Sequence, residues 1–61
     1  MAITVLYLHT DSNSDSLNVH ADEKGVHFVV APSNDKPFLV TLTEEQASKF
    51  ADSISHYLVT K

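Results

Sequence analysis

The sequence predicts an α+β domain, in which a four-stranded antiparallel β-meander is followed by one C-terminal α-helix packed on one face (ββββα). Three observations lead to this prediction. A capped amphipathic helix occupies the end of the chain, four short segments with β-type patterning precede it, and turn-forming residues separate those segments. The chain has 61 residues and contains no linker or internal repeat, so a single domain over 1–61 is expected.

The first predicted strand covers residues 2–9, AITVLYLH, which are rich in β-branched and aromatic side chains. Regular alternation along a strand places Val5 and Tyr7 together on one face and the two leucines of this segment on the other. Both faces are then apolar, as in a strand that is covered on two sides. The polar segment 10–16, TDSNSDS, is predicted to form the connection that follows.

Segments 16–21 and 26–31 are predicted to form a hairpin around a four-residue loop, Asp22-Glu23-Lys24-Gly25. Gly25 is the only glycine of the chain, and it falls where such a turn needs a left-handed residue. The resulting register makes His20 and His27 direct cross-strand neighbours. It also places six apolar residues together on the opposite face: Leu17, Val19, Ala21, Val26, Phe28 and Val30.

Residues 32–37 form the next predicted turn, and residues 38–42, FLVTL, form the fourth strand. The helix is predicted over Thr43 to Leu58, because Thr43 and Gln46 match a capping box at its start. Its apolar residues recur at helical spacing: Ala47, Phe50, Ala51, Ile54 and Leu58. A helix of this length is marginal alone in water, so the stripe is expected to be buried against the sheet.

Charge and composition exclude several classes of function. Eight acidic residues against four lysines give a formal charge of −4, so direct binding to nucleic acid or to an anionic membrane is not expected. The chain lacks cysteine, which excludes disulfides and thiolate metal sites. Without a signal-peptide pattern or a long apolar run, the expected location is the cytoplasm.

The sheet face opposite the helix is the predicted interaction surface. One helix covers one face of a sheet, so the other face should leave apolar side chains exposed among polar ones. We expect this face to mediate homodimerisation, binding to a larger protein partner, or both. The predicted interface residues are Val5, Tyr7, His20, His27, Val29 and Leu39. Tyr7 is the expected anchor, because aromatic residues often dominate the energy of an interface.

Two motifs resemble parts of metal sites, but neither leads to a predicted metal or cofactor. His20 and His27 offer two imidazoles, with His9 or Asp22 as a third ligand, but zinc sites usually need three or four ligands at defined spacing. Segment 11–15 reproduces the D-x-N-x-D opening of a calcium loop. The sixth position, counted from Asp11, is Ser16, whereas a calcium loop has glycine there. The segments on both sides are predicted strands and not helices, so an ordinary turn is expected.

The expected function is that of a small non-enzymatic protein–protein interaction module, dimeric, that binds and blocks or modulates a larger protein. The sequence contains neither a nucleophile elbow nor a phosphate loop, the motifs that would indicate an enzyme. Two alternatives are a metal- or small-ligand-binding protein using His20 and His27, and an acidic nucleic-acid mimic, for which the carboxylates are sparse. In size and compactness the chain is similar to bacteriophage accessory proteins, including inhibitors of host defence, although no shared motif supports that likeness.

Overall fold

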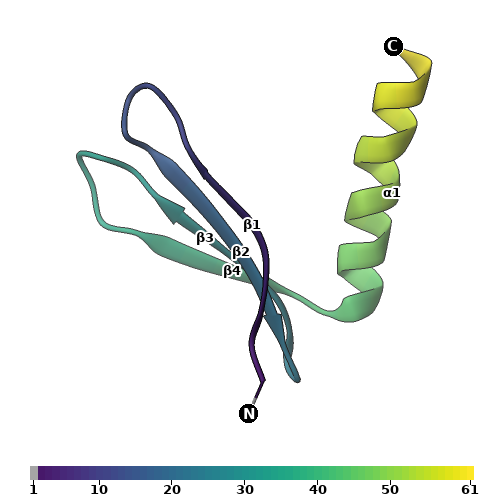
Figure 1. The fold of residues 1–61 in the computed structure, drawn as a ribbon. Coiled ribbons are helices and arrows are strands. Elements are labelled where there is room, and N and C mark those ends of the chain that lie inside the picture. The colour runs from purple at the N-terminus through teal and green to yellow at the C-terminus, as the bar shows by residue number, and fades with distance from the viewer. Residues whose placement is uncertain (1) are drawn as a thin grey trace.

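The computed structural model describes residues 2–61 as one four-stranded sheet followed by one helix (Figure 1). The elements are β1 (Thr4–Thr10), β2 (Ser16–Asp22), β3 (Gly25–Ala31), β4 (Phe38–Leu42) and α1 (Glu44–Thr60). The strands lie in the order β1-β2-β3-β4, and each pairs with its neighbour in antiparallel fashion. The predicted ββββα fold is therefore confirmed.

The β2–β3 hairpin has the predicted register but a tighter turn. Val19 lies opposite Phe28, as the alternation of apolar residues requires. Asp22 pairs with Gly25, so the turn has two residues and not the predicted four. Gly25 has a φ of 137°, and a Cβ at this position would collide with the carbonyl oxygen of Leu42. Glycine is required here for both its backbone angle and this close approach of β4.

A β-bulge in β1 overturns the predicted position of Tyr7. Val5 pairs with His20, but the next paired residue is Tyr7, opposite Val19, so Leu6 is the extra residue. One extra residue reverses the alternation of side chains. Tyr7 therefore lies on the Val19 face, and Val5 keeps its predicted place on the opposite face. The prediction that Tyr7 shares a face with His20, His27, Val29 and Leu39 was wrong.

The predicted capping box at the start of α1 is confirmed. The Thr43 hydroxyl accepts a hydrogen bond from the Gln46 N–H at 3.2 Å, and the Gln46 side-chain oxygen accepts one from the Thr43 N–H at 3.0 Å. Two acidic residues in the first turn complement the positive end of the helix dipole. Thr43 is the single residue between β4 and α1, so the helix starts where the strand ends.

The helix covers only part of the sheet face that carries Val19. The Phe28 and Phe50 rings meet edge to face, with centroids 5.2 Å apart. From the β4–α1 connection, however, the helix diverges from the sheet (Figure 1), and it approaches β3 and β4 but neither β1 nor β2. Phe50 and Ile54 each remain 45% exposed, so the expected burial of the helical stripe is not reached within one chain. Val19 is the one hydrophobic residue of the part described, 2–61, that is buried.

Candidate protein-interaction surfaces

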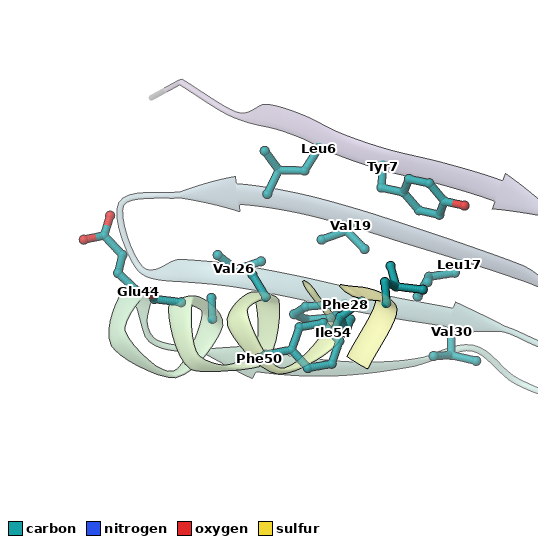
Figure 2. Close-up of a pocket in the computed structure, with 14 residues that line it drawn as sticks. Leu6, Tyr7, Leu17, Val19, Val26, Phe28, Val30, Glu44, Phe50 and Ile54 are labelled. Atoms are coloured by element: carbon teal, nitrogen blue, oxygen red, sulfur yellow. The ribbon is translucent and has the colours of Figure 1, made fainter. Parts of the chain in front are cut away.

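An apolar groove of about 1000 Å³ lies between α1 and the Val19 face of the sheet (Figure 2). Side chains from β1, β2 and β3 form its floor, and the apolar stripe of α1 forms its wall. The groove is defined here by Leu6, Leu17, Val19 and Phe28 on the sheet and by Phe50, Ile54 and Leu58 on the helix.

Few of the side chains that line the groove are polar or titratable. Of its fourteen lining residues, Tyr7, Glu44 and Ser48 carry polar side-chain groups, and the others are aliphatic, aromatic or alanine. Figure 2 shows Glu44 at one end, beside the start of the helix, far along the groove from Tyr7. General acid–base catalysis needs a titratable side chain within hydrogen-bond reach of the proton that it transfers, and the mostly apolar lining provides few such groups. The lining is instead typical of a surface that another apolar surface covers.

The opposite face of the sheet, which we call the outer face, holds five of the six predicted interface residues. The register places Val5, His20, His27, Val29 and Leu39 together on it. Leu8 joins them, because the bulge moves it to the Asn18 side; regular alternation had placed it on the other face. Val5, Leu8 and Leu39 are 56–63% exposed, whereas Val29 and His20 are half-buried. The outer face is therefore an apolar patch around two histidines.

His27 has a structural role on this face. Its ring lies 5.1 Å from that of His20, which confirms that the two are cross-strand neighbours. The ring is buried, and both of its nitrogens are hydrogen-bonded at 2.9 Å, Nε2 with the Asp22 carboxylate and Nδ1 with the Thr41 hydroxyl. An ionised carboxylate only accepts, so Nε2 carries the proton, and in the neutral ring the hydroxyl of Thr41 donates to Nδ1.

The contact with His27 changes the acidity of Asp22, which is the last residue of β2. The hydrogen bond from His27, followed by the one from the Lys24 N–H, lowers the pKa of the Asp22 carboxyl below its ordinary value. The sequence singled out Asp22 and His27 as candidate ligands but gave no sign that they bind each other. His9 lies on the other face, stacked near Tyr7. Within residues 2–61, no three histidine, cysteine or acidic side chains are grouped to hold a metal ion.

The β1–β2 connection is an Asx-rich turn. The Asp11 carboxylate accepts hydrogen bonds from the N–H groups of Asn13 and Asp15, and Ser14 takes a left-handed φ of 66°. The Asp15 carboxylate accepts a further one from the Ser33 N–H, which ties this turn to the β3–β4 connection. The carboxylates that resembled calcium ligands therefore serve as acceptors for the backbone.

Comparison of the chain with protein-family models, with curated proteins and with solved structures finds no match. In residues 2–61, no helix has the length and apolar character needed to cross a bilayer.

Proposed function

We propose that this protein is a non-enzymatic protein–protein interaction module that forms a homodimer and acts by binding a larger protein, which it blocks or modulates. One observation carries the proposal. A folded protein of 6.7 kDa is expected to expose about 3,900 Å², whereas this chain exposes 4932 Å². Large apolar side chains are exposed on both faces of the sheet and on the helix. Another polypeptide is the natural cover for so much apolar surface.

The outer face is the proposed site for the larger partner. Its exposed apolar side chains are Val5, Leu8 and Leu39. The polar side chains of Asn18 and Thr41 are exposed beside them, and the Asp22 carboxylate is bonded to His27 at the end of this face. The fitting partner surface is apolar at its centre with hydrogen-bonding groups around it. Binding should then respond weakly to salt, unlike binding of a basic cleft to an acidic mimic.

The alternative of a metal- or small-ligand-binding protein has less support. His27 already uses both ring nitrogens within the fold, so His20 would have to bind a ligand without it. A cytoplasmic location stays part of the proposal and agrees with a sequence that lacks cysteine.

The proposal is tested by capture from an extract of the source cells with three immobilised forms of the chain. These are the wild type, the double variant Val5→Ser/Leu39→Ser, and the control Val59→Ser, which changes a valine on α1 that is 81% exposed and outside the groove. We expect a protein that the wild type and the control retain at both 0.1 and 1 M NaCl and that the double variant loses at least tenfold. Equal retention by all three forms would contradict the outer-face assignment.

A further inference from the structure

The groove is open to solvent, and its uncovered part has a definite location. The helix stands over β3 and β4, so Leu6 and Tyr7 of β1 and Leu17 of β2 face the groove with no helix above them. A helix is about 10 Å across, and strands lie about 4.8 Å apart, so one helix spans about two strands. A four-stranded face needs two helices, and each chain provides one.

The way in which α1 is attached fixes its start at the β4 edge of the sheet. Thr43 alone separates the end of β4 from α1, and it is fixed by the capping box. The end of β4 is fixed in turn, because the Leu42 carbonyl packs directly against Gly25. The start of the helix is therefore tied to the β4 edge, with no length of chain to carry it across the sheet.

We propose that the groove is filled by α1 of a second copy of this chain, in a reciprocal dimer in which two helices lie side by side between two sheets. The inference rests on the proposed function, since it names the partner that covers one of the two apolar surfaces. Each chain presents both halves of such an interface: a half-exposed stripe on α1, and an open floor on β1 and β2 that a partner's stripe would cover. A two-fold axis satisfies both at once.

The dimensions agree with this arrangement. The chain exposes about 1,000 Å² more than a monomer of its mass should, and a stable interface buries about 800 Å² on each partner. The stripe from Ala47 to Leu58 is about 17 Å long, and a seven-residue strand such as β2 is about 23 Å long. The partner's stripe thus fits along the floor of the groove.

Charge also favours a second copy. Each chain carries a formal charge of −4, which would oppose pairing if the carboxylates met. Among the lining residues, however, Glu44 alone is charged, and it sits at the end of the groove. A small apolar molecule could also enter the groove, but it would supply no reason for the exposed stripe and the uncovered strands to occur together.

The test uses the unaltered chain in two steps. Sedimentation velocity from 1 to 500 μM should give a particle of twice 6.7 kDa. Isotope-filtered NMR on a mixture of labelled and unlabelled chains should then give interchain contacts from Ile54 and Leu58 to Leu6 and Leu17. In one chain α1 does not approach β1 or β2, so such contacts identify the partner's helix.

A matched pair of variants tests the groove by its effect on the dimer dissociation constant. Leu58 lines the groove and its neighbour Val59 does not. Leu58→Ser should weaken dimerisation at least tenfold, and Val59→Ser should leave the dimer dissociation constant within about twofold.

Three results would overturn the inference: a monomer at every concentration, a dimer whose interchain contacts run through Val5 and Leu39, or a co-purified small molecule that native mass spectrometry finds on the monomer and NMR contacts place against Leu6 and Leu17. If the outer-face variants still abolish capture of the larger partner, the proposed binding function stands without this dimer.

Discussion

Because Gly25 has no side chain, the end of β4 can approach the β2–β3 turn closely. The Gly25 φ of 137° is one that other residues rarely adopt, and an added Cβ would collide with the Leu42 carbonyl. We predict that Gly25→Ala lowers the free energy of unfolding by about 1–3 kcal/mol. Urea denaturation at one fixed protein concentration measures the change.

Lys24→Ala is the control for this substitution. Lys24 is exposed in the same turn and has no special backbone angle, so its change should stay within about 0.5 kcal/mol. Equal stability of the Gly25→Ala variant and the wild type would mean that β4 does not pack as tightly on the turn as described.

Asp22 gives the protein a pH dependence whose sign follows from its lowered pKa. Hydrogen bonds from His27 and the Lys24 N–H favour the ionised form, so the folded pKa lies below the unfolded one. The stability that this provides is present above about pH 4, the ordinary carboxyl pKa, and is lost as the pH falls through the folded value. We predict that Asp22→Asn is less stable than the wild type at pH 7.

The difference between Asp22→Asn and the wild type should shrink steadily below about pH 4, because the wild-type carboxyl then takes up its proton. Urea midpoints between pH 2.5 and 7 would measure it. Glu23→Gln, which changes an exposed carboxylate in the adjacent turn, is the control. A pH-independent difference would mean that the Asp22–His27 contact does not shift the titration.

At the scale of secondary-structure elements, the sequence predicted the type and order of every element. The β2–β3 register was predicted because apolar and polar residues alternate along 17–21, which favours one pairing. The bounds of β4 were predicted because the turn-forming residues end at Pro37 and the helix cap is Thr43. The face of Tyr7 was not predictable. Residues 2–8 are apolar at nearly every position, so slipping by one residue exchanges one apolar face for another. No glycine or proline marks the bulge at Leu6.

The start of α1 is the element boundary that the sequence specified best, and it also carries a prediction. The Thr43 hydroxyl satisfies the Gln46 N–H, which has no partner inside the helix. We predict that Thr43→Ala lowers the free energy of unfolding by about 1 kcal/mol. Thr43→Ser, which keeps the hydroxyl, should cost much less, and thermal unfolding followed by circular dichroism distinguishes them. Equal losses in both variants would point to the lost methyl group and not to the cap.

At the scale of the whole molecule, the chain is more extended than its length requires. Its radius of gyration is 13.0 Å, against about 10.5 Å expected for a compact domain of this size. Amphipathic patterning predicted that the helical stripe is buried but could not say by which chain. The pattern of apolar residues indicates which side chains are buried. The pattern is the same whether they are buried by the same chain or by a partner.

The open groove has a consequence for how the protein would respond to its own abundance. If a second copy must close it, the active species grows with the square of the chain concentration while the protein is dilute. Halving expression would then reduce that species about fourfold, and doubling it would raise the species about fourfold. A groove left unfinished in one chain thus makes the amount of active species depend more than proportionally on dosage.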